Sequence, residues 1–243
     1  MKALILAAGT ASRLRPLTDN TPKCLLKIGE RSLLQRSIDA LVANGVTELA
    51  IVTGYLHEMI ENFVGATYPD LKVTFIHNEV YATTNNIYSL WLARPFAEGE
   101  EVLLLDSDLL YDPRIVSRVL SSEAENVLTL IKHPLGEEEM KVVIDNSGNI
   151  TEINKTCAPL SAAGESLGIE KMGKAYTTAL YGELEQMMLG ENLVNIFYER
   201  AFERLIAQGH TFRVLDVSDL FSCELDTVED FENAREKVPA ALY

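Results

Sequence analysis

In the first half of the chain, short runs of apolar residues alternate with stretches in which apolar residues recur at helical spacing. The continuous runs predict buried strands at residues 2–7, 49–53 and 101–105, and a further strand at 73–76. The helical spacing predicts helices that end at Asn44-Gly45 and at Gly65 or Tyr68-Pro69, and a third that is capped by Thr84 or Asn85. Such alternation predicts a parallel sheet wrapped by helices.

The second half of the chain has a less regular pattern. Two strands, a turn at 145–149 and a partner strand predict a small antiparallel insertion, at 127–131, 140–144 and 150–154. Residues 155–174 are small and polar, and we expect a long loop there that covers a substrate pocket. The remaining elements are expected as a strand at 175–180, a helix at 195–207, a strand at 212–217 and a helix at 228–237.

These elements together predict an α/β protein with a mostly parallel, Rossmann-like central sheet flanked by helices. We found no linker, repeat or low-complexity segment, so one domain covering residues 1–243 is the simplest interpretation. Ligands of such sheets bind at the carboxyl ends of the strands, and the segment after the first strand is therefore the first candidate site.

Charge is distributed unevenly along the chain. The net charge is −15, which argues against a nucleic-acid binder, yet the first 31 residues carry six basic and two acidic side chains. A local basic patch of this kind suits a small polyphosphate ligand. Three widely spaced cysteines, no signal peptide and no long apolar stretch lead us to expect a cytoplasmic protein without membrane insertion.

The segment after the first strand has the composition of a phosphate-binding loop. Small residues let backbone N–H groups approach an anion, and Arg13 and Lys23 add positive charge at fixed offsets. The alternative is a tight surface turn after an edge strand. The nucleotide-binding candidates in this part of the chain are Leu6, Ala8, Gly9, Thr10, Ala11, Ser12, Arg13 and Lys23.

Two further polar clusters follow predicted strands. Asp106 and Asp108 end the strand at 101–105, where two carboxylates would repel each other unless a cation such as Mg²⁺ lay between them. A helix-capping aspartate before Pro113 is the alternative. The polar segment around residue 85 adds three side chains that we expect to face a ligand, namely Asn85, Asn86 and Ser89.

The motif Leu-Ala-Ala-Gly at residues 6–9, followed by Ser12-Arg13-Leu14 and Pro22-Lys23, resembles the signature of sugar nucleotidyltransferase-like enzymes. Asp108 and Asp226 match the two metal-binding aspartates of that superfamily. Within it, the chain looks most like the bacterial phosphocholine cytidylyltransferases and their aminoalkylphosphonate relatives, by its segments 52–58, 78–81, 86–90 and 223–226. Ala11 departs from the pattern, since the superfamily usually has glycine there.

The resemblance implies transfer of CMP from CTP to a phosphorylated amino alcohol such as phosphocholine, or to an aminoalkylphosphonate, with release of pyrophosphate. Residues 1–110 would then bind the nucleotide, Asp106 included, and residues 111–243 the acceptor. Arg13, Lys23, Asp108 and Asp226 are the expected catalytic residues, with Mg²⁺ held by the two aspartates. The residues expected to bind the acceptor are Lys23, Tyr88, Glu170, Tyr176 and Glu224. For the last four, a purely structural role is the alternative.

Two other functions stay open at this point. A sugar 1-phosphate acceptor would make the chain a sugar nucleotidyltransferase. The second is a catalytically silent nucleotide-binding regulator, which we would expect to lack one of the metal-binding aspartates or the lysine. This chain has Lys23, Asp108 and Asp226. The nucleotide base and the oligomeric state also stay open, and a homodimer is one of the oligomeric states compatible with the sequence.

Overall fold

Strand β1 (Lys2–Ala7) lies in the middle of a nine-stranded sheet in the computed structural model, which describes residues 1–242. The main path of the sheet is β10-β9-β11-β6-β1-β4-β5, and β8 and β12 extend it from β11. The other strands are β4 (Glu48–Thr53), β5 (Lys72–His77), β6 (Val102–Asp106), β8 (Val127–Ile131), β9 (Lys141–Ile144), β10 (Ile150–Asn154), β11 (Gly164–Met172) and β12 (Arg213–Asp216). Strands β5, β4, β1 and β6 are parallel, and β11 is antiparallel to β6, which confirms the predicted fold class.

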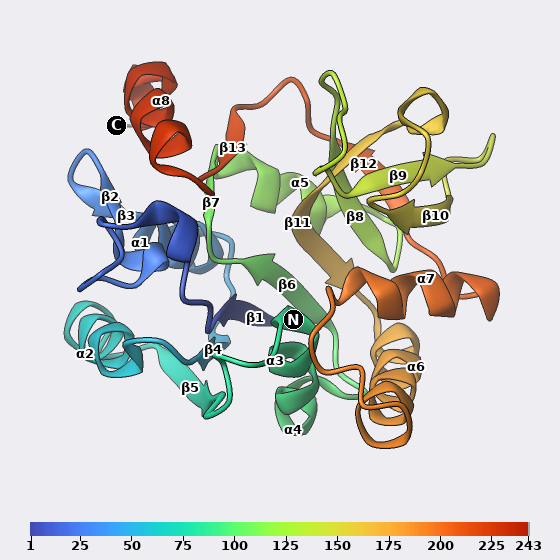
Figure 1. Ribbon diagram of the computed structural model, residues 1–243, viewed down its shortest axis with the longest axis horizontal. Helices are drawn as coiled ribbons and strands as arrows, with labels where there is room; N and C mark the ends of the chain where they lie inside the picture. The colour runs from blue at the N-terminus through green and yellow to red at the C-terminus, as the bar shows by residue number, and fades with distance from the viewer. Residues whose placement is uncertain (243) are drawn as a thin grey trace.

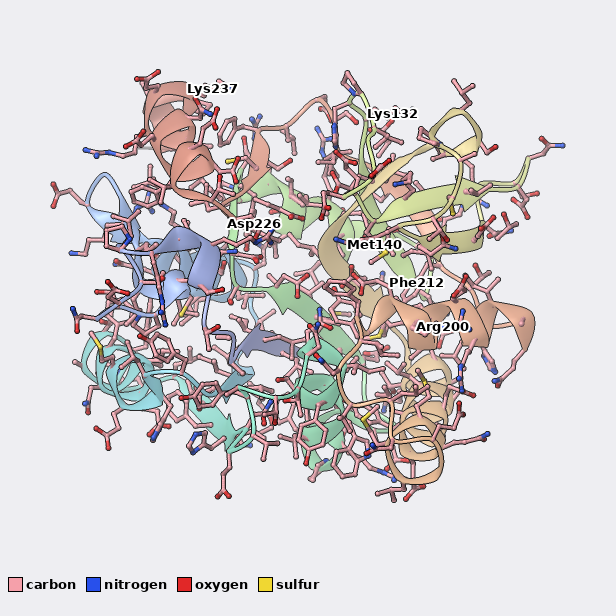
Figure 2. All side chains as sticks on the ribbon, viewed as in Figure 1. Lys132, Met140, Arg200, Phe212, Asp226 and Lys237 are labelled. Atoms are coloured by element: carbon pink, nitrogen blue, oxygen red, sulfur yellow. The ribbon has the colours of Figure 1, made fainter. Side chains whose placement is uncertain are left out.

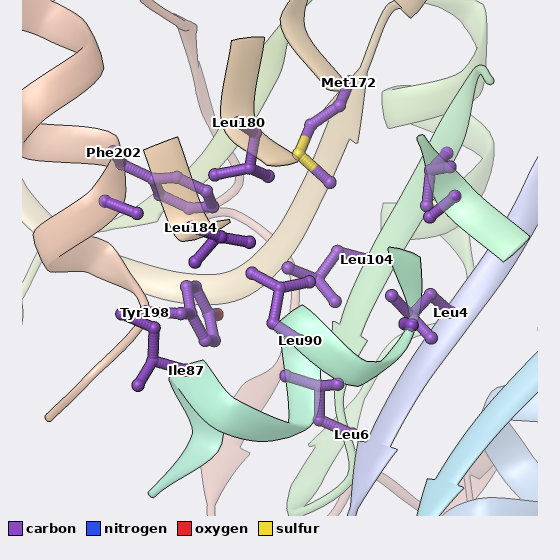
Figure 3. Packing of buried hydrophobic residues seen from close by; sticks show 14 of the residues in the cluster. Leu4, Leu6, Ile87, Leu90, Leu104, Met172, Leu180, Leu184, Tyr198 and Phe202 are labelled. Atoms are coloured by element: carbon purple, nitrogen blue, oxygen red, sulfur yellow. The ribbon is translucent and has the colours of Figure 1, made fainter. Parts of the chain in front are cut away.

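Helices cover both faces of this sheet (Figure 1). One apolar cluster joins Ala3 and Ile5 of β1 to α1 (Leu33–Ala43), α2 (His57–Thr67) and α5 (Arg114–Ser121). The other joins Leu4 and Leu6 to α3 (Asn86–Leu92), α4 (Arg94–Ala97), α6 (Lys174–Glu185) and α7 (Glu199–Ala207), as Figure 3 shows for part of it. Because side chains alternate between the faces of a strand, a continuous apolar run is what a doubly covered strand requires.

A smaller unit lies beside the main sheet and carries part of the site. It consists of β2 (Lys27–Ile28), β3 (Arg31–Ser32), β7 (Leu109–Tyr111), β13 (Ser222–Glu224) and α8 (Val228–Lys237). Strands β7 and β13 pair antiparallel, with Glu224 opposite Leu109, and the Leu225 backbone N–H donates to the Asp108 carbonyl at 3.1 Å. This pairing brings Asp226 next to Asp108 across more than a hundred residues of sequence.

Three predictions for the second half were wrong. The expected loop at 155–174 contains β11, in which the buried apolar residues are interrupted by Ser166, Glu170 and Lys171, which are polar but also buried. The expected strand at 175–180 belongs to helix α6, on which Tyr176, Leu180 and Leu184 recur at helical spacing. The helix expected from residue 195 begins at Glu199 instead.

The helices of the described residues are all shorter or more polar than a bilayer-spanning helix has to be. The longest of them, α6, has 12 residues.

Candidate active site

The loop after β1 is held by close backbone contacts. Ala11 adopts a left-handed conformation with φ of 47°, where glycine is favoured and alanine costs on the order of 1 kcal/mol. The Thr18 hydroxyl and the Leu14 backbone N–H both donate to the Ala11 carbonyl, at 2.9 and 3.0 Å. These bonds hold the turn despite the unfavourable dihedral angle, and Ser12–Leu14 continue it as a short 3-10 helix.

Gly54, at the end of β4, allows the neighbouring strand to approach this loop. A Cβ atom at Gly54 would lie 2.6 Å from the Ala8 carbonyl oxygen and 2.8 Å from Cβ of Tyr81. The next residue, Tyr55, donates its backbone N–H to the same Ala8 carbonyl at 3.2 Å. The close contact between β4 and the loop therefore depends on a residue without a side chain.

Lys23 lies between two carboxylates that come from distant parts of the chain. Its Nζ is 2.9 Å from Asp108 Oδ2 and 2.7 Å from Asp226 Oδ1, and the side chain is only 13% exposed. Arg13 donates to the other oxygen of Asp226 at 2.6 Å. Two cationic and two anionic side chains are thus gathered at one point, beyond the ends of β1 and β6.

The pKa values of this cluster follow from its mutual pairing. Burial alone would lower the pKa of Lys23, but Asp108 and Asp226 outweigh it and raise that pKa above its usual value. Burial would likewise raise the pKa of Asp226, and Lys23 and Arg13 lower it. The lysine is therefore cationic and Asp226 anionic at neutral pH.

The cluster borders a cavity of about 370 Å³ that collects residues from both halves of the chain. From the loop and the neighbouring strands it is lined by Leu6, Ala8, Gly9, Ala11, Arg13, Lys23, Asp106 and Asp108. From the second half, Met140, Lys155, Glu165, Ser166, Phe197, Glu199, Glu224 and Asp226 contribute. Figure 2 labels Asp226 and Met140, which line the cavity from the small unit and from the segment before β9.

Asn85, Asn86 and Ser89 also line the cavity, and each has a structural partner there. Asn85 caps α3 by accepting from the Asn86 backbone N–H, and Ser89 accepts from the Asn78 side chain at 3.1 Å. Asn86 Oδ1 accepts from the Tyr198 backbone N–H at 2.9 Å. Asn86 therefore also fixes the start of α7, which lies directly beside it.

Five predicted site residues are not among those that line the cavity. Thr10 and Ser12 belong to the loop after β1 but do not line the cavity. Tyr88 packs against Trp91, with ring centroids 5.3 Å apart. Tyr176 is buried in the core, where its ring lies 4.5 Å from Phe212, so its predicted contact with the acceptor has no support. Glu170 is fully buried behind the wall, with Ser166 between it and the cavity.

The far wall of the cavity is acidic. Burial, together with Asp108, Glu165 and Asp226, raises the pKa of Glu224 to about 8. Burial and the carboxylates of Asp108 and Glu170 raise the pKa of Asp106 well above its usual value, and the Tyr198 hydroxyl donates to Asp106 Oδ2 at 3.1 Å. A cation in the cavity would favour the ionised form of these carboxyl groups, so the wall suits a cationic ligand.

Asp106 keeps its position because β11 has a glycine opposite it. Gly168 has a φ of 80°, and a Cβ atom there would lie 2.6 Å from Asp106 Oδ2. The pairing of β11 with β8 shifts register between Ser166 and Glu170, around this glycine. The bulge turns part of β11 toward the cavity, where Glu165 and Ser166 line the wall.

Sequence reasoning missed Lys155, Glu165, Phe197 and Glu199. Lys155 and Glu165 fall in the segment that was expected to be a loop over a pocket, so their region was indicated but not their roles. Phe197 and Glu199 were included in a predicted amphipathic helix, and the sequence pattern carries no signal that separates them from its other residues.

In residues 1–242, no group of three or more His, Cys, Asp or Glu side chains has the arrangement of a metal site. The two aspartates that converge on Lys23 are a pair. Mg²⁺ is commonly held in proteins by one or two carboxylates plus substrate phosphates, and a pair of this kind meets that requirement.

Comparison with known proteins places this geometry in a family. Residues 2–153 match the sequence model of the family described as nucleotidyl transferase. The chain is 26% identical over 259 residues to a CTP:phosphoglutamine cytidylyltransferase of Campylobacter jejuni, covering 98% of this chain and all of that protein. It is 29% identical over 245 residues to a CMP-5'-(3-aminopropyl)phosphonate synthase of Streptomyces rubellomurinus, covering 96% of this chain but 38% of that protein.

Solved structures with the same fold have low sequence identity to this chain. The CTP:phosphocholine cytidylyltransferase of Streptococcus pneumoniae superimposes with a TM-score of 0.80 at 21% identity, over 98% of this chain and 99% of the other. An inositol-1-phosphate CTP transferase of T. maritima gives 0.79 at 20% identity, over 97% and 93% of the two chains. These similarities support the fold alone.

Proposed function

The chain belongs to the nucleotidyl transferase family, and from this premise we propose that it transfers CMP from CTP to a phosphorylated small amino alcohol or an aminoalkylphosphonate. Pyrophosphate is the second product. The observation that carries the proposal is the cluster of Arg13, Lys23, Asp108 and Asp226 beside a small-residue loop, at the edge of a cavity with an acidic far wall.

The reaction joins two anions and needs no nucleophile from the protein. A phosphate or phosphonate oxygen of the acceptor attacks the α-phosphorus of CTP, and the bond between that phosphorus and the oxygen bridging to the β-phosphate breaks. The electron pair leaves with pyrophosphate. The work of the protein is to hold two negatively charged substrates together in line and to offset the charge on the α-phosphate.

Each side chain of the cluster has a distinct part in this proposal. Arg13, the more exposed cation, neutralises the β- and γ-phosphates as they leave. Lys23, held deeper in the cavity, contacts the α-phosphate or the acceptor phosphate. Backbone groups of Leu6, Ala8 and Gly9 meet the base and ribose, since these residues line the cavity at the end of β1 and just beyond it.

Asp108 and Asp226 would hold Mg²⁺, because their oxygens already converge on one cationic group, the Lys23 ammonium. The ion would supply further positive charge to the α-phosphate and acceptor oxygens. Glu224, two residues before Asp226 and on the acidic wall, would face the amine end of the acceptor.

Relatives with names that specify CTP and an amine-bearing or related acceptor support this choice of substrates. The choline-phosphate cytidylyltransferase of Streptococcus pneumoniae is 38% identical over 109 residues, which cover 45% of this chain and 46% of that protein. The acidic wall of the cavity is the feature of this chain that suits such an acceptor.

A pyrophosphate-release screen tests the proposal. Each of the four ribonucleoside triphosphates is combined with Mg²⁺ and with phosphocholine, phosphoethanolamine, 2-aminoethylphosphonate or a hexose 1-phosphate. We expect release with CTP and one or more of the amine-bearing acceptors. Turnover confined to hexose 1-phosphates, or turnover with no pair at all, would contradict the proposed function.

A further inference from the structure

Glu199 is a buried acid at the acceptor end of the cavity that the proposed reaction has not used. It is the first residue of α7, it lines the cavity, and it is 8% exposed. Its Oε2 atom is buried and has no hydrogen-bond partner within residues 1–242. A buried acceptor oxygen without a donor is costly, so the cavity is incomplete at this point.

The position of Glu199 is fixed by its neighbours on both sides. The Tyr198 backbone N–H donates to Asn86 Oδ1 at 2.9 Å, and the Tyr198 hydroxyl donates to Asp106 Oδ2 at 3.1 Å. These two bonds hold the start of α7 against the end of β6 and the start of α3. The carboxylate is therefore held in place before any ligand binds, which lowers the entropy cost of binding.

The groups that face Glu199 leave it open to a cationic partner. Two further carboxyl groups, Glu170 of β11 and Asp106 of β6, lie near it, and Glu199 contributes to the raised pKa of each. Lys155 is the basic residue on this wall, but its Nζ lies 4.7 Å from the centroid of the Phe197 ring and 3.8 Å from a Glu138 carboxylate oxygen. No ion pair joins Lys155 to Glu199 in the described part of the chain, and the Glu199 oxygen is left for a ligand.

The kind of cation follows from what the orphaned oxygen requires. A primary ammonium carries N–H groups that can donate to a buried carboxylate oxygen. A quaternary ammonium has none, and proteins hold it in cages of aromatic rings instead. The aromatic residues that line this cavity are Tyr81 and Phe197, and the ring of Phe197 is already covered by Lys155.

We propose that Glu199 is a specificity-determining residue, which accepts a hydrogen bond from an N–H group of the acceptor and so selects primary amines over quaternary ones. This inference rests on the proposed function, because it concerns the acceptor of that reaction. It assigns phosphoethanolamine-like or aminoalkylphosphonate-like molecules, rather than phosphocholine, as the preferred class.

A methylation series tests the proposal on the intact chain. The value of kcat/KM is measured with CTP and with phosphoethanolamine, its N-methyl and N,N-dimethyl derivatives, and phosphocholine. Each methyl group replaces one N–H, and the last replacement removes the only remaining donor. We expect kcat/KM to fall at least about tenfold at that last step, since a buried oxygen is then left unsatisfied.

The variant Glu199→Gln separates recognition from packing. It removes the charge at nearly constant shape, and we expect kcat/KM for phosphoethanolamine to fall at least about tenfold while KM for CTP is unchanged and the preference over phosphocholine is reduced. Glu203→Gln, one turn further along α7 and outside the cavity lining, removes the same charge and should leave that preference intact. Circular dichroism checks that both variants are folded.

Each outcome has a definite meaning. If the wild type uses phosphocholine as well as or better than phosphoethanolamine, the inference is overturned and the proposed function stands. If Glu199→Gln folds and keeps the wild-type preference, the role of Glu199 is likewise refuted. If Glu199→Gln does not fold, the methylation series on the wild type decides. If none of the acceptors leads to pyrophosphate release, the proposed function itself is overturned, and this inference with it.

Discussion

Asp108 is the residue on which the proposed chemistry depends most directly. It shares the Lys23 ammonium with Asp226, and it follows β6 on the polar edge of the sheet. We predict that Asp108→Asn lowers kcat by at least about a hundredfold, because the charge that would hold Mg²⁺ is lost, while the fold persists. Pyrophosphate release measures the rate and thermal unfolding checks the fold. Asp70→Asn, an exposed change remote from the cavity, is the control, and a near-normal rate for Asp108→Asn would remove Asp108 from the metal role.

Gly168 determines whether Asp106 can lie where it does. We predict that Gly168→Ala lowers the free energy of unfolding by about 1–3 kcal/mol, because φ is 80° and the new Cβ would meet Asp106 Oδ2 at 2.6 Å. Activity should fall as well, since Asp106 has to move. Gly65→Ala in α2 has open space around it and should stabilise the protein by about 0.5–1 kcal/mol. Urea unfolding of both variants tests the pair, and equal stabilities would contradict it.

The buried carboxyl group of Glu199 makes stability depend on pH. Burial raises its pKa from 4.5 to about 7 in the folded state, where Lys155, Glu170 and Asp106 face it. Between these two pH values Glu199 is ionised in the unfolded chain but still protonated in the folded chain. Its contribution to the free energy of unfolding is therefore fully present below about pH 4.5 and is lost as the pH rises to about 7.

The glutamine of Glu199→Gln does not ionise, so the stability of this variant relative to wild type should increase with pH. We expect the difference to grow by on the order of 3 kcal/mol between pH 4.5 and pH 8. Urea unfolding at the two pH values measures it, with Glu203→Gln as the control for losing a charge from α7. A difference that does not change with pH would show that Glu199 titrates normally in the folded protein.

At the scale of elements, helix α8 begins at a capping box beside Asp226. The Thr227 hydroxyl accepts from the Asp230 backbone N–H at 3.1 Å, and the Asp230 carboxylate accepts from the Thr227 backbone N–H at 2.8 Å. Thr227→Ala should cost about 1 kcal/mol of stability and also lower kcat, because Asp226 loses its fixed neighbour. Thr227→Ser keeps the hydroxyl and should restore both. Unfolding and pyrophosphate assays on the two variants would refute this if alanine and serine behaved alike.

Elements with a clean apolar pattern could be predicted from the sequence, and those with a mixed pattern could not. Strands β1 and β4 are buried on both faces and have unbroken apolar runs, so their positions were predicted correctly. Strand β11 buries Ser166, Glu170 and Lys171, and such a sequence does not differ from a polar loop. These polar residues are buried by tertiary contacts, such as the bond from Lys171 Nζ to the Ser122 carbonyl at 2.7 Å.

The candidate site divides in the same way. Arg13, Lys23, Asp108 and Asp226 lie in short motifs that carry their chemistry locally, and the structure brings all four together as expected. The acceptor wall is assembled from separate segments, around the bulge in β11 and the start of α7. Its members, such as Glu165 and Glu199, are specified by tertiary packing, which local sequence does not reveal.

At the scale of the whole molecule, the two halves of the chain meet at the cavity. The basic loop of the first half faces the acidic wall of the second, and Asn86 connects them through the backbone of Tyr198. An anionic nucleotide and a cationic amine would thus each be matched by one side of the cavity. We therefore expect a phosphate or phosphonate carried by that amine to be joined to CMP where the two sides meet.

This expectation can be tested by following product formation in a single reaction. The chain is incubated with CTP, Mg²⁺ and 2-aminoethylphosphonate or phosphoethanolamine, and phosphorus NMR follows the CMP adduct and pyrophosphate together. We expect one pyrophosphate for each CMP adduct. Hydrolysis of CTP without an adduct, or no change in CTP at all, would contradict it.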